Sequence, residues 1–421
     1  MKQYPKYKDS GIQWIGQIPE GWNVLRFKHC FNTSTGMSIA KSDLTESGVA
    51  VISYGQIHAK TNTRTHLSDD LLRYIPCELI KGGDTCKLRK NDIVFADTSE
   101  DLEGCGNAAF IDTDQEVFAG YHTIIARPII EGEIKYLAYL FNTPVWRQQL
   151  RENVAGIKVY SITQKLLNDS CLLLPPVSEQ ESIVRYLDDK TAKIDDTVNL
   201  LEQQKTDLQQ YRKALISQTV TRGLNPNAKL KDSGIQWIGQ IPEEWETSRI
   251  KDIIDTRSGI NLPSEKILSQ GKYPVYGGNG IRGYYLEYSN EGDFILIGRQ
   301  GALCGNINYA SGRFWATEHA VVCYPKKNLA LKWLGELLRT MNLGQYSISA
   351  AQPGLSMERI KNLPIPLPPI SEQQAIADFL DSKTATIDQS IANIETQIAD
   401  LRAYRTALIS DVVNGKIDVR N

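Results

Sequence analysis

The chain has 421 residues, 41% hydrophobic and 23% charged, a composition that is typical of a folded globular protein and excludes wholesale disorder. Its 47 basic and 49 acidic residues give a net charge of −2, so a nucleic-acid binder of this composition must gather its positive charge on one face. The sequence has no apolar run of about 18 residues and no apolar signal core at its start, so we expect neither a membrane span nor secretion.

The seven cysteines are scattered along the chain. They stand at positions 30, 77, 86, 105, 171, 304 and 323, form no Cys-x-x-Cys pair and are odd in number. A zinc site is therefore not expected, and a reduced, cytoplasmic setting fits better. We interpret these cysteines as isolated small core residues.

A short motif near the start of the chain returns after its midpoint. Residues 8–20 read KDSGIQWIGQIPE and residues 231–243 repeat all thirteen, each copy being followed by one variable residue and then by Trp22 or Trp245. A longer segment, 174–224, recurs as 367–417 with 25 identities in 51 positions. A period near 200 residues is too long for a solenoid. The sequence therefore predicts a duplicated two-part unit and a pseudo-two-fold molecule.

Two variable blocks lie between these repeats. Each has short β-like runs separated by glycines, such as residues 51–54 and 294–297, and each ends in a helical stretch, around residues 134–151 and 329–341. They share a faint skeleton: Asp92-Ile93-Val94-Phe95, Cys105-Gly106-Asn107, Ala119-Gly120-Tyr121-His122 and Pro128 in the first, and Asp293-Phe294-Ile295-Leu296, Cys304-Gly305-Asn306, Ala316-Thr317-Glu318-His319 and Pro325 in the second. We predict two α/β domains of one fold with different loops.

Each long repeat predicts a helix with a heptad seam. The pairs Pro175-Pro176 and Pro368-Pro369 end the preceding structure, and the runs that begin at Ser178 and Ser371 predict capping boxes. Apolar residues recur every seven positions, at Leu187, Ile194, Leu201, Leu208 and Leu215 and again at Leu380, Ile387, Ile394, Leu401 and Leu408. This pattern is typical of a coiled coil, and about 45 residues would make a helix of roughly 65 Å.

One chain carries both seams, so we expect the two helices to pair with each other in the antiparallel sense. In that pairing we expect Ile194 to face Ile387, Ile394 and Leu401, and we expect Tyr211 and Tyr404 to add to the seam. Glycines at 223 and 415 suit the two helix ends. An ordinary oligomerisation coil between separate chains is the alternative.

Motifs of catalysis are missing from the sequence. It has no GxxxxGK[ST] phosphate loop, no Asx-Pro-Pro-aromatic motif of an amino-methyltransferase, and no convincing cluster of paired carboxylates with a lysine. The carboxylates that crowd one loop are interpreted as a solvated acidic turn: Asp97, Glu100, Asp101 and Glu103. His122 and His319 lack metal-spaced partners and are interpreted as satisfied core or groove residues. We expect the chain to catalyse nothing by itself.

The duplicated order of these motifs resembles the specificity subunits of type I restriction-modification enzymes, over essentially the whole length. The resemblance is carried by the twin Asp-Ser-Gly-Ile-Gln-Trp-Ile-Gly motifs, the twin Leu-Pro-Pro-x-Ser-Glu-Gln helix starts and the long helices after them. Residues 276–281, Tyr-Gly-Gly-Asn-Gly-Ile, and residues 297–301, Ile-Gly-Arg-Gln-Gly, also resemble the second domain of that family.

The resemblance implies an α/β (α+β) fold with two similar globular target recognition domains separated by two long antiparallel coiled-coil helices. The expected boundaries are 1–172 for the first motif and recognition domain, 173–224 for the first conserved spacer helix, 225–365 for the repeated motif and second recognition domain, and 366–421 for the second spacer helix. Each domain would read one half of a split, asymmetric target in double-stranded DNA.

The family also implies partners. Two adenine-methyltransferase subunits would dock on the helices, and translocase/endonuclease subunits could join them. S-adenosylmethionine, ATP and magnesium would belong to those partners, and this chain would hold no cofactor and no metal.

Candidate DNA readers are polar residues in the variable blocks, because arginine suits guanine and asparagine or glutamine suits adenine. In the first block we favour Lys60, Thr61, Asn62, Thr63, Arg64, Thr98, Ser99, Lys158 and Tyr160. In the second we favour Asn279, Arg282, Tyr284, Arg299, Gln300 and Gln352. Two alternatives stay open: a structural coiled-coil scaffold with passive heads, and a nuclease with an unrecognised site in the acidic loop of the first block.

Overall fold

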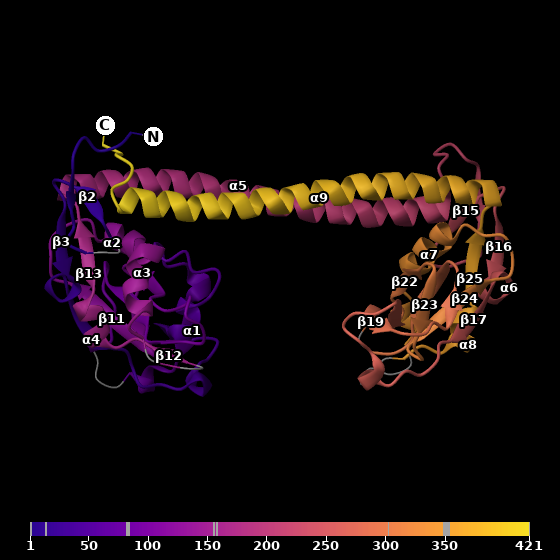
Figure 1. Ribbon diagram of the computed structural model, residues 1–421, viewed down its shortest axis with the longest axis horizontal. Helices are drawn as coiled ribbons and strands as arrows, with labels where there is room; N and C mark the ends of the chain where they lie inside the picture. Colours follow the sequence, from indigo (N-terminus) through magenta and orange to yellow (C-terminus); the bar gives the residue numbers. More distant parts are fainter. Residues whose placement is uncertain are drawn as a thin grey trace. The chain divides into compact units, whose positions relative to one another are not determined.

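The computed structural model describes residues 2–12, 15–80, 85–154, 156, 159–301, 303–347 and 354–420. Its internal contacts divide the chain into two compact units, Met1–Leu200 with Gln397–Asn421, and Leu201–Thr396. Each unit contains one recognition domain and parts of two long helices, α5 (Val177–Arg222) and α9 (Ile370–Val413) (Figure 1). Across the described ranges, none of the helices has the length and apolar character that a membrane crossing requires.

The first unit is built on an antiparallel sheet with the strand order β4-β11-β7-β9. Its strands are β4 (Phe31–Thr35), β7 (Ile93–Ala96), β9 (Ala108–Phe110) and β11 (Thr123–Pro128). Strand β7 reads Ile-Val-Phe-Ala and is buried along its whole length, as suits β-branched and aromatic residues at the centre of a covered sheet.

A second sheet of the first unit has the order β10-β5-β6. Here β10 (Val117–Ala119) runs parallel to β5 (Val49–Ile52), and β6 (Arg73–Ile75) runs antiparallel to β5. Three two-stranded ladders complete the unit: β1 (Tyr7–Asp9) with β2 (Gln17–Pro19), β3 (Asn23–Arg26) with β13 (Cys171–Leu174), and β8 (Thr98–Ser99) with β12 (Tyr160–Ser161).

Four short helices accompany these sheets: α1 (Tyr54–Ile57), α2 (Ile134–Phe141), α3 (Pro144–Arg151) and α4 (Gln164–Asp169). Helix α3 begins where Thr143 accepts a hydrogen bond from the Trp146 N–H and Pro144 occupies the first turn. Trp146 then packs on Phe95 of β7 and on Phe141 of α2, with ring centroids 5.8 and 4.4 Å away. The aromatic core therefore fixes α3 against the sheet.

The second unit repeats this plan. Its main antiparallel sheet, β17-β24-β21-β22, consists of β17 (Ile254–Ser258), β21 (Phe294–Gly298), β22 (Ile307–Ala310) and β24 (Ala320–Pro325). Its second sheet, β19-β18-β23-β20, consists of β18 (Tyr273–Gly277), β19 (Gly280–Tyr285), β20 (Asn290–Glu291) and β23 (Arg313–Ala316), and β18 runs parallel to β23.

The remaining elements of this unit also have counterparts in the first. The strand pairs are β14 (Leu230–Asp232) with β15 (Gln240–Pro242), and β16 (Glu246–Arg249) with β25 (Pro364–Leu367). The short helices are α6 (Ile250–Ile253), α7 (Leu331–Thr340) and α8 (Met357–Lys361), and a 3-10 turn follows α7 at Leu343–Tyr346. Buried Trp333 and Leu337 of α7 belong to one cluster with Ile295 of β21.

The predicted common fold of the two variable blocks is confirmed. The Cys-Gly-Asn segments form equivalent turns before β9 and β22, and the glycine of each lies in the left-handed region, with φ of 84° at Gly106 and 87° at Gly305. The two units differ in two strand pairs. The second unit has β20 paired with β23, and the first unit has the β8–β12 ladder.

The two long helices pair in the antiparallel sense inside each unit. In the first, the Arg405 guanidinium donates two hydrogen bonds to Asp195, at 2.9 and 3.1 Å. In the second, Arg212 binds Asp388 in the same way, at 2.8 and 3.1 Å. The offset of 193 relates both arginines and both aspartates, so one ion pair occurs twice.

Two details of the predicted seam are wrong. Ile194 does not face Ile387, Ile394 and Leu401 as predicted. The Asp195–Arg405 pair places Ile194 beside the α9 turn that holds Arg405 and Leu408. The Arg212–Asp388 pair places Ile387 beside the α5 turn that holds Arg212. In addition, Tyr211 and Tyr404 are about half exposed rather than part of the seam. Seam positions 187, 194, 380, 387, 394 and 408 are buried, and 201, 208, 215 and 401 are half-buried.

The helix starts also differ from the predicted capping boxes. Helix α5 begins at Val177, where Pro176 O accepts from the N–H groups of Glu179 and Gln180, so Ser178 lies inside the helix. Pro176 is therefore the residue just before the helix: its carbonyl accepts the first helical hydrogen bonds, and it has no N–H that would need a partner. Helix α9 begins in the same way at Ile370 after Pro369.

The glutamates that follow anchor the short motifs. The Trp22 indole N–H donates to Glu179 at 3.0 Å, and the Trp245 indole N–H donates to Glu372 at 2.8 Å. Glu179 is only 5% exposed and also accepts from the Tyr4 hydroxyl. Burial disfavours the phenolate, and the Glu179 carboxylate both accepts a hydrogen bond from the intact hydroxyl and repels a second negative charge, so the pKa of Tyr4 is raised. The two repeated motifs thus meet at a tryptophan–glutamate contact in each unit.

Candidate nucleic-acid interface

Strand β8 and its partner β12 bring three predicted readers together in the first unit. Tyr160 lies opposite Ser99 in the ladder, one position from Thr98. The Ser99 hydroxyl donates to Asp101 O at 2.6 Å, and the Thr98 hydroxyl donates to the Asp97 carboxylate at 2.7 Å. Lys158 lies outside the described residues.

The predicted reader loop 60–64 divides into exposed and internal residues. Lys60, Thr61 and Thr63 are exposed. Asn62 is buried, because its amide donates to Ile57 O and Ala108 O and its Oδ1 accepts from the Arg64 N–H. The side chain of Asn62 therefore fixes the loop from inside and offers no free polar edge to a ligand.

Arg64 occupies an unusual backbone conformation between two cavities. Its φ is +70°, a left-handed value that is uncommon for a residue with a side chain. It lines a cavity of about 510 Å³ near β8 and another of about 640 Å³ beside α5 and α9. The second cavity is also lined by Lys60, Asn62, Thr63, Arg402 and Arg405.

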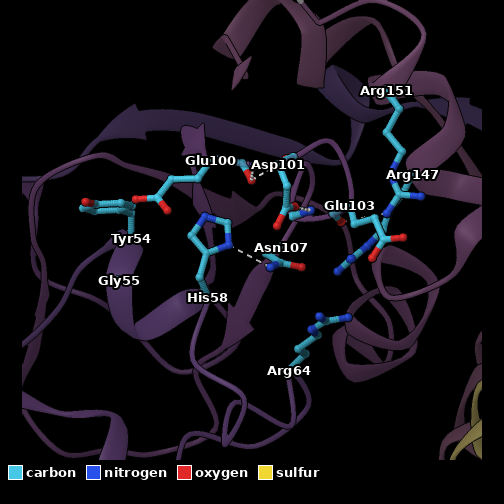
Figure 2. Close-up of a pocket in the computed structure, with 12 residues that line it drawn as sticks. Tyr54, Gly55, His58, Arg64, Glu100, Asp101, Glu103, Asn107, Arg147 and Arg151 are labelled. Carbon is cyan, nitrogen blue, oxygen red and sulfur yellow. Dashed lines mark hydrogen bonds between the residues drawn. The ribbon is translucent and has the colours of Figure 1, made fainter. Parts of the chain in front are cut away.

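The smaller cavity brings together three arginines from two elements and three carboxylates from a third (Figure 2). Arg64 comes from the loop after α1, Arg147 and Arg151 come from α3, and the loop after β8 supplies Glu100, Asp101 and Glu103. Arg147 is only 4% exposed. Burial lowers its pKa, and so do the neighbouring charges of Arg64 and Arg151.

A histidine and an asparagine line the same cavity in a defined orientation. His58 Nε2 lies 2.8 Å from Thr98 O, which only accepts, so this nitrogen carries the proton and donates. His58 Nδ1 then accepts from the Asn107 amide at 2.8 Å. The Asn107 Oδ1 is buried and has no hydrogen-bond partner among the described residues. Asn107 is the asparagine of the first Cys-Gly-Asn turn.

The acidic loop does not assemble a metal cage in the described part of the chain. Asp101 accepts from the Gly104 N–H, and Asp97 accepts from Thr98 and lies 3.2 Å from His122 Nδ1. Across the described residues, no group of three His, Cys, Asp or Glu side chains could hold a metal ion. His122 is exposed rather than a core residue, and His319 is half-buried beside Glu318.

In the second unit three predicted readers surround one depression of about 420 Å³. Asn279, Arg282 and Gln300 line it, together with His319. The Asn306 amide, which belongs to the second Cys-Gly-Asn turn, donates to Asn279 Oδ1 at 2.6 Å and orients it.

Two further predicted readers of this unit lie outside the depression. The backbone of Tyr284 bridges Leu268, and Arg299 donates to the Ser258 hydroxyl at 3.2 Å. Gln352 lies outside the described residues.

Sequence reasoning missed four side chains of the first cavity: His58, Asn107, Arg147 and Arg151. The recurrence of Cys-Gly-Asn in both blocks was a usable signal for Asn107, because it marks a turn that the fold keeps. Nothing local marks the arginines, since Arg147 and Arg151 belong to an ordinary amphipathic helix.

The helices themselves present a repeated aromatic and basic surface. In the first unit Lys190 lies 5.7 Å from the Tyr186 ring, and Tyr404 is exposed nearby on α9. In the second unit Lys383 lies 6.0 Å from the Phe379 ring, and Tyr211 is exposed on α5. Exposed aromatic residues beside cations are typical of protein-binding surfaces.

Comparison with known families gives one model that covers most of the chain. Residues 19–210 and 242–399 match the family described as type I restriction modification DNA specificity domain.

Two curated relatives extend over almost the whole chain. A putative MjaX specificity subunit of Methanocaldococcus jannaschii is 24% identical over 96% of this chain and 96% of the relative. The EcoKI specificity subunit of Escherichia coli is 21% identical over 96% of this chain and 90% of the relative.

A match over a shorter part of the chain has a higher sequence identity. The EcoprrI specificity subunit of Escherichia coli is 40% identical, over 36% of this chain and 38% of the relative. A second short match, in Haemophilus influenzae, spans 31% of that relative.

Two solved structures share the fold. A chain from a study of complex assembly and conformational transition of the type I R-M system superposes with a TM-score of 0.73, at 17% identity, over 95% of this chain and 99% of that chain. The HsdS subunit of Thermoanaerobacter tengcongensis gives a TM-score of 0.55 at 18% identity, over 95% of this chain and 98% of that chain.

Proposed function

We propose a function that proceeds from one premise: the chain belongs to the family of type I restriction-modification specificity subunits. Members of this family are the specificity subunits of an enzyme complex and not its catalytic subunits. In this chain, we propose, each recognition domain reads one half of a split, asymmetric sequence in double-stranded DNA.

A single observation carries this proposal. The two domains have the same sheets and the same Cys-Gly-Asn turn, yet different polar side chains surround that turn. Arg64, Ser99 and Asn107 line a cavity in the first domain, whereas Asn279, Arg282 and Gln300 line a depression in the second. Such a difference suits two readers of two unlike half-sites, because unlike donor and acceptor sets select unlike base edges.

We choose the proposed readers by whether their polar groups are available to contact DNA. In the second domain they are Asn279, Arg282 and Gln300, and Arg299 and Tyr284 are secondary candidates. In the first they are Lys60, Thr61, Thr63, Arg64, Thr98, Ser99 and Tyr160. Lys158 of the first domain and Gln352 of the second lie outside the described residues and stay candidates on the sequence alone. We leave Asn62 out, because its amide is already used by three internal hydrogen bonds.

The helices supply the proposed contacts with partner subunits. Two adenine-methyltransferase subunits would bind the repeated surface formed by Tyr186, Lys190 and Tyr404 in one unit and by Phe379, Lys383 and Tyr211 in the other. Translocase/endonuclease subunits would join through that complex. S-adenosylmethionine, ATP and magnesium would be bound by these partners. A cytoplasmic location would suit this role.

The test is to co-express the chain with its methyltransferase subunit and map the modified adenines in genomic DNA. We expect one split motif with two different halves. A continuous or palindromic motif would contradict two unlike readers, and methylation by the chain alone would contradict a subunit without catalysis. Combining Tyr404→Ala with Tyr211→Ala should weaken co-purification of the methyltransferase, while Leu200→Ala, at another exposed apolar position of α5, should not.

A further inference from the structure

We propose that the arginine-lined cavity of the first recognition domain binds a phosphate group through Arg64, Arg147 and Arg151. The phosphate can come from the DNA backbone, in which case the inference rests on the proposed function, or from a free nucleotide, in which case it does not. Both sources present the same anion to the same side chains.

Arg147 is a buried cation whose hydrogen-bond acceptors, among the described residues, are all neutral. Arg147 donates to Phe141 O at 2.9 Å and to Asn142 Oδ1 at 3.3 Å, and both acceptors are neutral. Among the described residues no carboxylate forms an ion pair with Arg147, Arg151 or Arg64. A buried cation without an anion is costly, and the nearby charges of Arg64 and Arg151 further disfavour the charged form of Arg147. An anion from outside would remove that cost.

The arginines of this cavity also have N–H donors that are available to a ligand. The Arg151 Nε is buried and has no hydrogen-bond partner in the described chain, while its Nη2 is held by Glu103 O at 2.7 Å. Arg64 has no side-chain hydrogen bond among the described residues, and it lines this cavity as well as the one beside α5 and α9. Guanidinium groups match phosphate oxygens with parallel N–H donors, which makes arginine well suited to phosphate recognition.

The cavity also holds an acceptor for the group attached to the phosphate. The unpaired Asn107 Oδ1 accepts hydrogen bonds only, and its orientation is fixed by the contact of the amide with His58. Figure 2 shows this amide between His58 and the arginine side of the cavity. A sugar hydroxyl or a base amino group supplies the missing donor, and a cavity of about 510 Å³ has room for more than a bare phosphate.

The second domain shows that this arrangement is no requirement of the fold. There Arg339, which lines the cavity beside the second Cys-Gly-Asn turn, donates to buried Glu336 at 2.5 Å and to Ile307 O at 2.9 Å. The same fold can therefore carry an arginine with its own carboxylate at this place. The first domain keeps its arginines unpaired.

The acidic rim offers the competing explanation. Glu103 lines the same cavity, and a small movement could make it the counter-ion of the arginines. If it were, Glu103→Gln would lower the melting temperature and would not improve phosphate binding. If phosphate is the counter-ion, Glu103→Gln removes a repelling charge, and phosphate binds several-fold more tightly with little change in melting temperature.

The first arm of the experiment uses the full chain without DNA. Inorganic phosphate and adenosine monophosphate are titrated at constant ionic strength against chloride, and melting temperature and binding heat are recorded. We expect both ligands to raise the melting temperature of the unmodified chain, the nucleotide more strongly. Arg64→Gln and Arg151→Gln should abolish this shift, and Arg147→Gln should abolish it if that variant folds. Arg26→Gln, outside the cavity, should keep it.

The second arm uses the complex with its methyltransferase subunit and a duplex that carries the target. If the phosphate is part of the DNA backbone, Arg151→Gln should weaken binding about tenfold for target and non-target duplexes alike and should lower the salt slope by about one. A base reader such as Arg282 should instead lose discrimination when changed to Ala.

The outcomes are distinct. If ligand raises the melting temperature in the first arm and Arg151→Gln does not change DNA binding in the second, the cavity binds a free nucleotide. If the melting temperature does not change but Arg151→Gln weakens DNA binding, the cavity binds a phosphate of the DNA backbone. Both results support the proposal. If the cavity variants leave both arms unchanged, the proposal is wrong. If no complex binds its target duplex, the proposed function fails, while the phosphate titration of the isolated chain still decides the cavity.

Discussion

The two recognition domains each place an arginine beside the same Cys-Gly-Asn turn, but only the second domain pairs it with a carboxylate. In the second domain Arg339 binds Glu336, whereas in the first Arg147 binds only neutral acceptors. The buried strands around both turns are alike, since β7 and β21 are covered sheet strands and both turns need a left-handed glycine. The fold therefore constrains the turn but leaves the charge beside it free to serve another purpose.

The largest expected effect tests whether the two halves of the duplication are equivalent. Ile194 and Ile387 are related by the offset of 193, and both are buried on the helix seam. Replacing either with Asp places an unpaired charge in an apolar contact and should lower the free energy of unfolding by about 3–5 kcal/mol. Urea denaturation measures this. Leu200→Asp, at a position that is 69% exposed, is the control and should cost less than about 0.5 kcal/mol. Unequal losses at 194 and 387 would break the equivalence.

A second pair of variants sharpens the contrast between the arginines. Arg339→Gln leaves the buried Glu336 carboxylate with Lys332, 3.8 Å away, as its cation, and should cost about 2–3 kcal/mol of unfolding free energy. Arg147→Gln removes a cation that has no carboxylate partner, so the cost should stay within about 1 kcal/mol. Both values come from denaturant unfolding in a buffer without phosphate. Equal destabilisation by the two changes would contradict the proposed difference in charge compensation.

The tryptophan anchors should give a smaller effect. Trp22→Phe and Trp245→Phe keep most of the buried ring but remove the indole N–H that donates to Glu179 or Glu372. Losing a hydrogen bond to a charged group should cost about 1.5–2 kcal/mol in each unit. Melting curves of the two variants measure the loss. A cost near zero at both positions would mean that the tryptophans act by packing alone.

The repeated ion pair between the helices should give the smallest effect. Arg405 with Asp195, and Arg212 with Asp388, are partly exposed pairs with bidentate geometry. Double-mutant cycles with alanine should give a coupling of about 0.5–1 kcal/mol for each pair, and the coupling should fall as salt is added. A coupling that does not respond to salt would argue against exposed ion pairs.

The sequence predicted the large features because each had a repeated, local signal. The thirteen-residue motif, the heptads and the Cys-Gly-Asn segments each occur twice, and the structure has two domains of one fold with long helices that pair inside each unit. The predicted start of α5 was wrong because Ser178 and the residues after it match the local pattern of a capping box. In the structure Glu179 instead accepts a hydrogen bond from the indole N–H of Trp22, which is 157 positions away in the sequence.

The candidate sites were harder to predict because their side chains contact residues that are far away in the sequence. Asn62 looks like a reader in the sequence, yet its amide reaches Ala108 O, 46 positions away. Arg147 lies on an ordinary helical pattern, and its unusual property is the absence of a carboxylate beside it within the described chain. Such an absence depends on which segments the tertiary fold brings near, and no spacing rule reports it.

The central claim is that each recognition domain reads its own half-site, and a domain exchange tests it most directly. Residues 244–365 are replaced by the corresponding block of a relative with a different target, the chimera is co-expressed with the methyltransferase subunit, and modified adenines are mapped across the genome. Because the two domains have separate cores and separate polar loops, we predict that one half of the recognised sequence changes and the other half is retained. A change in both halves, or in neither, would contradict the account.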